Sequence, residues 1–226
     1  MTTTANAAVQ RIHAALPQTQ CQRCGYPDCA SYAQAIVEEN APINRCAPGG
    51  VEGIGRIAQA MGQPELAHNL PLNSEFGVEG PMTVAIIDEN WCIGCTLCIK
   101  ACPTDAIVGS NKRMHTVLEQ WCTGCDLCAL ACPVDCIRME PISGERTGWA
   151  AWSPELATTA LQRYTFHQFQ VERAERENAA RLESKAQEKL ADLGKHSQIT
   201  EPQVLDKKRA LIEAAMAKAR ARQLGN

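Results

Sequence analysis

Apolar residues at helical spacing predict two short helices near the N-terminus of this chain. The first covers residues 5–16 and the second residues 30–39 (ASYAQAIVEE). In each, the apolar positions recur every three to four residues and so fall on one face. The stripes are formed by Val9, Ile12 and Leu16 in the first helix and by Tyr32, Ala35 and Ile36 in the second. We expect both faces to pack into one small module.

Strands are predicted further along, where β-branched residues gather. Residues 83–87 (TVAII) and 116–118 (TVL) are the two such runs, and this composition suits strands. Between the helices and the first strand, residues 63–81 are rich in Pro and Gly and predict a linker. The pattern therefore changes from helix to strand at about residue 82.

The last third of the chain predicts helix with only a thin apolar stripe. Ser153 is a good N-cap and Pro154 suits the first helical position. Gly194 offers a stop, and a second helical stretch follows over about 202–222. A solvated pair of charged helices is the simpler interpretation, and contact of its basic end with anionic lipid or acidic protein is the alternative.

Composition limits the size of any core in this chain of 226 residues, because aromatic residues make up 4%. Small modules of this kind need a staple, and the 13 cysteines supply one. An odd count and regular short spacings favour metal over disulfides, in a reducing cytoplasm. No secretory signal and no run of 18 apolar residues is seen, so we expect no membrane span.

Charge is divided unevenly along the chain. Residues 1–153 carry nine Lys or Arg against fifteen Asp or Glu, a net −6, whereas residues 154–226 carry thirteen against ten, a net +3. An acidic body disfavours nucleic acid and favours docking on basic protein surfaces. Nucleic acid is therefore not expected as a partner.

Eight cysteines form two near copies of one motif, C-x2-C-x2-C-x3-C-P, placed thirty residues apart. Residues 86–107 and 116–137 share twelve of twenty-two positions. This run holds 4Fe–4S clusters in bacterial ferredoxins, and the fourth cysteine of each run there ligates the other cluster. By that rule cluster 1 takes Cys92, Cys95, Cys98 and Cys132, and cluster 2 takes Cys122, Cys125, Cys128 and Cys102. Structural zinc is the alternative, but zinc sites separate their C-x2-C pairs by a longer loop.

Four further cysteines near the N-terminus have the spacing C-x2-C-x4-C-x16-C. They are Cys21, Cys24, Cys29 and Cys46. Spacing alone leaves zinc and a third cluster, cluster N, equally open. The predicted helix over residues 30–39 would bring Cys46 back towards the other three.

The surrounding residues add a resemblance to a known family. The stretch from Leu16 to Gly50, with its Cys24-Gly25-Tyr26-Pro27 and Cys46-Ala47-Pro48 landmarks, resembles the B subunit of Rnf/Rsx-type electron-transport complexes. In that family a four-cysteine 4Fe–4S domain precedes a two-cluster ferredoxin domain, in the order found here. The resemblance covers residues 12 to about 153. It implies three 4Fe–4S clusters and transfer of single electrons.

The same resemblance implies partners and a location. Such complexes couple electron transfer between ferredoxin or NADH and other carriers to ion movement, so redox proteins and membrane subunits are the expected partners. Members often begin with an apolar membrane helix, which is not seen here. We therefore expect a cytoplasmic protein, attached through partner subunits to the cytoplasmic face of the inner membrane. The alternatives are a free soluble polyferredoxin and a zinc-bearing interaction protein.

The fold class that follows is α+β in four segments. We predict a mainly helical N-terminal module at 1–62, a linker at 63–81, a ferredoxin-like domain with a pseudo-two-fold repeat at 82–140, and a connector with a long helical tail at 141–226. No nucleotide-binding loop or paired catalytic residues are found, so no substrate-converting site is assigned.

The remaining chemically notable residues receive simple interpretations. Cys136 stands opposite Ala106 in the repeat alignment and predicts a buried thiol that behaves as a small hydrophobe. Trp91 and Trp121 each precede a cysteine loop and predict hydrophobic cover. The five histidines lack ligand spacing and are interpreted as ordinary.

Overall fold

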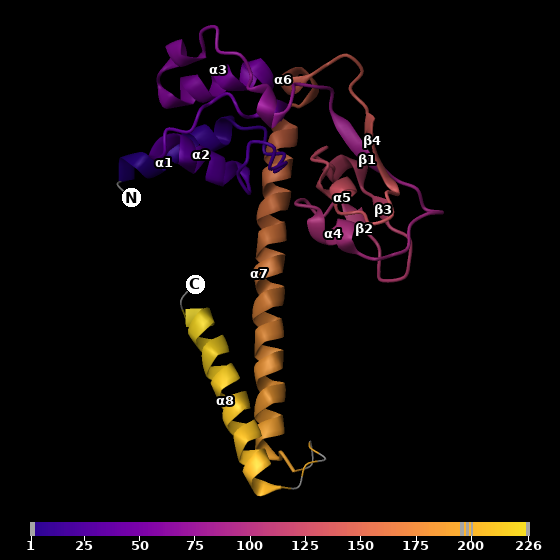
Figure 1. Ribbon diagram of the computed structural model, residues 1–226. Helices are drawn as coiled ribbons and strands as arrows, with labels where there is room; N and C mark the ends of the chain where they lie inside the picture. Colours follow the sequence, from indigo (N-terminus) through magenta and orange to yellow (C-terminus); the bar gives the residue numbers. More distant parts are fainter. Residues whose placement is uncertain (1–2, 195–196, 198, 200, 225–226) are drawn as a thin grey trace. The chain divides into compact units, whose positions relative to one another are not determined.

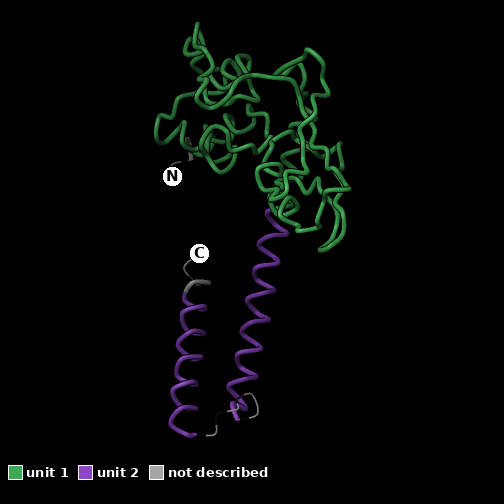
Figure 2. Tube along the Cα trace, turned by 45° about the vertical axis from the view of Figure 1, so that its right-hand side comes forward, with its two compact units in different colours: residues 1–167 green, residues 168–226 purple. Residues whose placement is uncertain are grey.

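The computed structural model describes residues 3–194, 197, 199 and 201–224. Its contacts divide the chain into two units, residues 1–167 and 168–226, which Figure 2 shows in green and purple. The division falls inside the longest helix. The four-segment division expected above stays a prediction, and each unit is described separately below.

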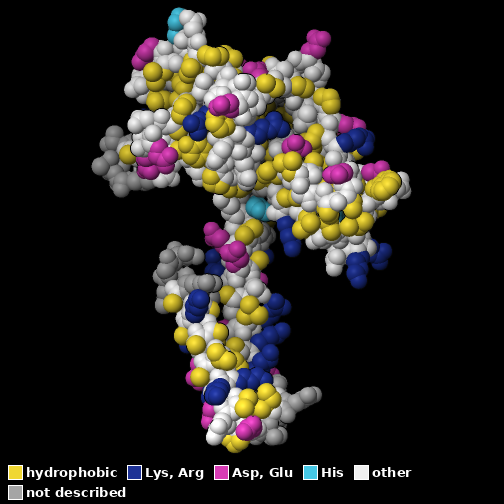
Figure 3. All heavy atoms as spheres, in the orientation of Figure 1, with side chains coloured by type: hydrophobic (Ala, Val, Ile, Leu, Met, Phe, Trp, Pro, Cys, Tyr) yellow, Lys and Arg dark blue, Asp and Glu magenta, His cyan; other side chains and the backbone are white. Residues whose placement is uncertain are grey.

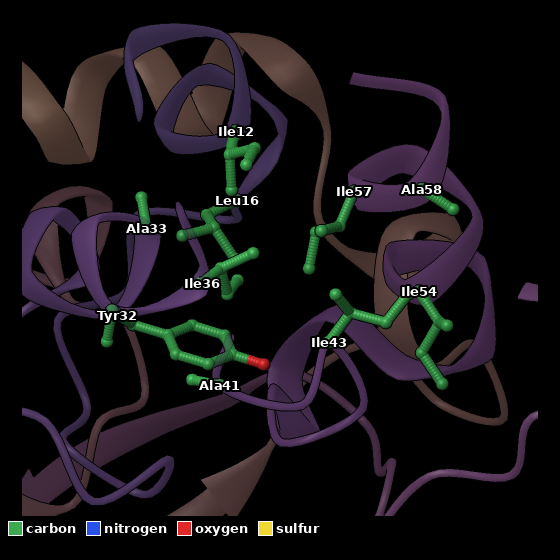
Figure 4. Packing of buried hydrophobic residues seen from close by; sticks show 11 residues of the cluster. Ile12, Leu16, Tyr32, Ala33, Ile36, Ala41, Ile43, Ile54, Ile57 and Ala58 are labelled. Carbon is green, nitrogen blue, oxygen red and sulfur yellow. The ribbon is translucent and has the colours of Figure 1, made fainter. Parts of the chain in front are cut away.

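Three helices build the N-terminal module at 1–62: α1 (Thr3–Ala15), α2 (Cys29–Glu38) and α3 (Gly50–Met61) (Figure 1). The two helices predicted in this region are confirmed, whereas α3 was not predicted. All three turn apolar side chains towards a common core, which Figure 4 shows from close by. The largest members of that core are Ile12, Leu16, Tyr32, Ile36, Ile43, Ile54 and Ile57. The predicted packing of both stripes is thus present.

Local hydrogen bonds fix the ends of these helices. Asp28 is the N-cap of α2, and its carboxylate accepts from the N–H of Ser31 at 2.7 Å. The hydroxyl of Tyr32 donates to the carbonyl of Pro42 at 2.7 Å, which fixes the loop after α2. This loop leads to Cys46 and the short 3-10 helix η1 (Ala47–Gly49).

The predicted linker at 63–81 has defined structure. It contains two 3-10 helices, η2 (Pro64–Ala67) and η3 (Ser74–Phe76). At its end the Glu79 carboxylate accepts from the N–H of Val51 at 3.1 Å and from the hydroxyl of Thr147 at 2.7 Å. Glu79 therefore binds the N-terminal module to a segment almost seventy residues further along the chain.

The ferredoxin-like domain contains two small antiparallel sheets. Strand β1 (Thr83–Ile87) pairs with β4 (Ile137–Pro141), and β2 (Ile107–Val108) pairs with β3 (Thr116–Val117). Each sheet takes one strand from each sequence repeat, which gives the predicted pseudo-two-fold arrangement. Short helices follow the cysteine loops, and Figure 1 shows them near β2 and β3. They are α4 (Leu97–Ala101) and α5 (Leu127–Leu130), whereas the 3-10 helix η4 (Glu119–Trp121) precedes the second cysteine loop.

Residues 148–167 pack against both of these parts. Helix α6 (Gly148–Ala151) is followed by α7 (Pro154–Ala191), whose start agrees with the predicted N-cap, since the Ser153 hydroxyl accepts from the N–H of Leu156 at 3.3 Å. The indole of Trp152 donates to the carbonyl of Pro17 at 2.8 Å. Tyr164 donates to Asp28 at 3.0 Å, and Arg163 donates to the carbonyl of Thr104 at 3.0 Å. We call this segment, residues 148–167, the clamp.

The second unit contains the rest of α7 and helix α8 (Pro202–Leu224), which lie side by side in Figures 1 and 2. Apolar residues of both helices, such as Leu182 and Ile212, line a groove between them. Arg220 pairs with Glu183 at 2.6 Å. Figure 3 shows Lys and Arg side chains along part of α7. Within residues 3–194 and 201–224, no helix has both the length and the apolar content that a membrane span requires.

Candidate metal centres

The four cysteines predicted for cluster 2 come together across the two repeats. Cys122, Cys125 and Cys128 line a cavity with Cys102, which comes from the first repeat. Burial, together with neighbouring thiols of the same set, raises the pKa of Cys125 and of Cys128 to about 12. The crossing cysteine therefore lies among the three cysteines of the opposite loop.

The set predicted for cluster 1 is assembled in the same way. Burial raises the pKa of Cys98, and the charges that add to this effect come from Cys95, Cys92 and Cys132. Cys132 belongs to the second repeat, so the exchange between the repeats is reciprocal. Cys98 is 5% exposed, at the start of α4.

The N-terminal set is brought together by the loop before α2 and by the segment that follows it. Burial raises the pKa of Cys29 to about 12 and that of Cys46 well above its usual value. Both thiols also interact with Cys21 and Cys24. The buried side chain of Gln20 accepts from the N–H of Cys29 at 2.9 Å and so fixes the start of α2 at this site.

These sets fit a cationic, thiophilic group. Four thiolates buried together repel one another and are stable only beside a cation, and soft sulfur donors suit iron–sulfur clusters. Within the described residues, no three Cys, His, Asp or Glu side chains form a site for a single metal ion. The assignment therefore rests on the motif spacing and on the mutual interactions of the thiols.

The cysteine loops bend through glycines that no larger residue could replace. Gly94 has φ +69°, and a Cβ there would lie 2.5 Å from the backbone nitrogen of Arg113. Gly124 has φ +66°, and its Cβ would lie 2.6 Å from the carbonyl oxygen of Thr83. Both loops thus pass against a neighbouring backbone in a left-handed conformation that favours glycine.

Cys136 is buried, as predicted, but its thiol also contacts a predicted ligand. Its Sγ lies 3.5 Å from Cys132 Sγ. Burial, followed by this contact, raises the pKa of Cys136 to about 12. Burial opposes ionisation of Cys132 as well, yet the N–H groups of Val134 and Cys136 and the Cys136 thiol hold the pKa of Cys132 below its usual value. The side chain is therefore a polar neighbour of the predicted ligand Cys132 rather than a simple hydrophobe.

His115 is the residue that sequence reasoning missed. It is 1% exposed, and its Nδ1 lies 3.2 Å from Cys98 Sγ. Its Nε2 is buried and has no hydrogen-bond partner among the described residues. The prediction that all histidines are ordinary is therefore wrong for His115. A signal lies one position before the aligned repeats, where the same offset of thirty residues places His115 opposite the small residue Ala85.

The two tryptophans differ in their surroundings. Trp121 packs on the core of the ferredoxin-like domain, and the Arg163 guanidinium lies 3.8 Å from its ring centroid. Trp91 is 70% exposed, so the prediction of hydrophobic cover is wrong for this residue. The reason is that the clamp covers the loop of the second repeat at Trp121, whereas Trp91 lies on an open surface.

Together, the paired repeats and their crossed cysteine sets define an iron–sulfur electron-transfer protein. Residues 85–139 match the family model of the 4Fe–4S dicluster domain, and residues 16–48 match that of a putative Fe–S cluster. Relatives named as the B subunit of an ion-translocating oxidoreductase complex match about three fifths of this chain. The relative from Azoarcus sp. (strain BH72) is 60% identical over 134 residues, which are 59% of this chain and 71% of the relative.

A second relative of the same name, from Alkalilimnicola ehrlichii, is 52% identical over 146 residues, or 64% of this chain and 76% of the relative. A third, from Erwinia tasmaniensis, is 51% identical over 142 residues, which are 62% of this chain and 72% of the relative. The chain belongs to this family of Rnf-type B subunits. The expected family and its iron–sulfur chemistry are thereby confirmed.

Proposed function

We propose that this chain holds three 4Fe–4S clusters and passes single electrons through them. The observation that carries the proposal is the assembly of each cysteine set in the structure, including the crossing members Cys102 and Cys132. The ligand sets are Cys21, Cys24, Cys29 and Cys46 for cluster N, Cys92, Cys95, Cys98 and Cys132 for cluster 1, and Cys122, Cys125, Cys128 and Cys102 for cluster 2. When bound, each cluster would accept and return one electron.

The surroundings of the two loops suggest a route for those electrons. The loop of cluster 1 presents exposed apolar side chains: Trp91 is 70%, Ile93 58% and Leu97 42% exposed. The loop of cluster 2 instead faces the N-terminal module, where the Thr123 hydroxyl donates to the carbonyl of Thr19 at 2.9 Å. Electrons would therefore cross between a redox partner at cluster 1 and cluster N by way of cluster 2.

The setting we propose is the B subunit of an ion-translocating electron-transport complex, as the names of the relatives indicate. Redox proteins and membrane subunits would be its partners, and these would attach it to the cytoplasmic face of the inner membrane. A stand-alone polyferredoxin that serves another reductase is the second candidate. The exposed loop of cluster 1 suits either, because both need an accessible cluster.

Iron and sulfide assays on anaerobically prepared protein test the cluster number. Three clusters require about twelve irons per chain. Cys46→Ser should reduce the iron content by about four, whereas Cys136→Ala, which removes a buried thiol outside the sets, should leave it near twelve. A wild-type content near eight, unchanged by Cys46→Ser, would remove cluster N from the proposal.

A pull-down of tagged protein after mild detergent extraction tests the setting. Recovery with integral membrane subunits supports the complex, and recovery alone or with a soluble reductase supports the second candidate.

A further inference from the structure

The two repeats differ at the position that faces the third cysteine of each loop. At cluster 1 this position is His115, whose Nδ1 lies 3.2 Å from Cys98 Sγ. A thiolate only accepts hydrogen bonds, so the ring nitrogen is the donor when Cys98 is a ligand. At cluster 2 the corresponding residue, thirty positions earlier, is Ala85, which lines the same cavity as Cys128 and has no polar side chain.

The space for the imidazole is matched by a second difference between the repeats. A Cβ on Gly109 would lie 2.3 Å from His115 Cδ2, so only glycine leaves room for the ring. In the other repeat the residue equivalent to Gly109 is Met139, which is the strand partner of Ala85 and lines the cavity of cluster 2. A large and a small residue have thus changed places, and the histidine has a fitted position beside Cys98.

The fourth cysteines show the same one-sided pattern. Cys102 accepts the N–H of Ala106 at 3.2 Å, and Cys132 accepts the N–H of Cys136. The side chains at these two equivalent positions differ. Ala106 adds nothing polar, whereas the Cys136 thiol lies 3.5 Å from Cys132 Sγ and can donate to it. Cluster 1 therefore has two side-chain donors on its ligands.

Polar side chains near cluster 2 do not provide equivalent donors. Thr104 Oγ1 lies 3.8 Å from Cys102 Sγ, and the Thr123 hydroxyl contacts Cys125, but each hydroxyl donates its one proton to a backbone carbonyl, at 2.8 and 2.9 Å. The carboxylate residue Asp126 lines the cavity of cluster 2, where the first repeat has Thr96. The nearby cation Arg163 has a carboxylate partner at 3.8 Å, which offsets its charge.

We propose that cluster 1 is the first of the pair to be reduced, because His115 and Cys136 donate hydrogen bonds to its ligands, whereas the two hydroxyls beside the ligands of cluster 2 donate their protons to backbone carbonyls. The added electron makes the ligand sulfurs more negative, so a donor stabilises the reduced state more than the oxidised state and raises the potential. This inference rests on the ligand sets proposed above. Its consequence is that the first electron is held at the exposed loop.

A matched pair of variants tests the role of His115 in the whole protein. His115→Leu removes the donor, whereas His115→Asn is smaller but keeps an N–H close to the position of Nδ1. The readout is a redox titration followed by electron paramagnetic resonance. We expect His115→Leu to lower the higher of the two reduction potentials of clusters 1 and 2. The expected change is about tenfold in the equilibrium constant for reduction, which is about 59 mV for a one-electron couple. His115→Asn should stay near wild type.

The second donor has its own pair, Cys136→Ala and Cys136→Ser. Cys136→Ala introduces the residue that the first repeat has at this position, Ala106, and should lower the potential of cluster 1. Cys136→Ser keeps a donor and should lower that potential less. If His115→Leu fails to assemble, the reciprocal variant Ala85→His with Met139→Gly moves the imidazole to cluster 2. That variant should raise the lower potential, and an unchanged lower potential would overturn the inference.

Iron content and spin integration separate this inference from the proposed function. Fewer than two clusters in residues 82–140 would contradict the ligand sets, whatever the potentials are. With both clusters present, the inference is overturned by an unchanged higher potential in His115→Leu, by a shift of the lower one, or by equal shifts in the Leu and Asn variants. Equal shifts would mean that packing, not hydrogen bonding, sets the value.

Discussion

Two buried tryptophans of the clamp allow a controlled measurement of what joins the N-terminal module to the rest of the first unit. Trp152 is 6% exposed, and its indole donates to the buried carbonyl of Pro17. Trp149 lies in the same apolar cluster at 9% exposure, but its indole nitrogen is buried with no hydrogen-bond partner among the described residues. Trp→Phe at either position deletes the same atoms, so the two variants differ mainly in one hydrogen bond.

The magnitudes follow from these contacts. Trp152→Phe leaves a buried carbonyl without its donor, which costs about 1–3 kcal/mol, and the smaller ring loses about 1–2 kcal/mol of apolar contact. Trp149→Phe loses similar contact and about 0.5–1 kcal/mol of the interaction with Arg56, which lies 3.8 Å from the ring centroid. It also removes an unsatisfied donor, which returns about 1–3 kcal/mol. We therefore expect a cost of about 2–5 kcal/mol for Trp152→Phe and a change within about 2 kcal/mol of zero for Trp149→Phe.

The assay is thermal bleaching of the cluster absorbance under anaerobic conditions. A single scan rate is needed because cluster loss makes unfolding irreversible. For a chain of this size 1 kcal/mol corresponds to about 2–4 °C, and the centres of the two expected ranges differ by about 3.5 kcal/mol. The midpoint of Trp152→Phe should therefore be lower than that of Trp149→Phe by about 7–14 °C. Equal decreases in the two midpoints, or a larger decrease for Trp149→Phe, would refute the reasoning that this hydrogen bond stabilises the contact between the N-terminal module and the clamp.

Three further predictions use the same midpoint assay. Between about pH 7.5 and about pH 5.5 the wild type should lose more stability than His13→Gln, because burial lowers the pKa of His13 below 6.5. Gly124→Ala should destabilise by more than about 1 kcal/mol, since its φ is positive and a backbone oxygen blocks the Cβ, whereas Gly55→Ala, with open space in a helix, should stabilise by about 0.5–1 kcal/mol. Arg163→Met should cost about 1–3 kcal/mol because the guanidinium covers Trp121 and donates a hydrogen bond.

The sign of the pH effect follows from the lowered pKa of His13. Burial is its main cause, and Asp28 and Gln18 oppose it in part. The unfolded chain then binds the proton more readily than the folded one, so stability is full above about 6.5 and is lost as the pH falls from there towards the lowered value. An identical pH response in His13→Gln would contradict this. A stabilised Gly124→Ala or an unchanged Arg163→Met would contradict the other two predictions.

The cysteine sets and the family could be read from the sequence because their signals are local. A spacing of two or three residues is a property of one loop, and the N-cap at Ser153 is likewise decided by adjacent residues. Helix α7 ends at Ala191, slightly before the predicted stop at Gly194. Such small errors are usual where the last turn of a helix has few contacts.

The features that could not be predicted from the sequence depend on contacts between distant residues. Helix α3 contains Gly50, Gly53 and Gly55, which weaken any helix signal, and it is held by burial of Ile54 and Ile57 in the core of the module. The contact of His115 with a cysteine depends on how the strands of two repeats align. The hydrogen bond from Trp152 to Pro17 joins residues 135 positions apart, and no local sequence pattern predicts it.

The position of the clamp near the end of the first unit has a consequence for biosynthesis. Chains leave the ribosome N-terminus first, and domains fold as they emerge. Both cysteine-bearing parts are therefore exposed before residues 148–167 are made, and the bonds from Trp152, Arg163 and Tyr164 close over them last. The order of synthesis thus makes the joint between the two cysteine-bearing parts form only after both parts have emerged.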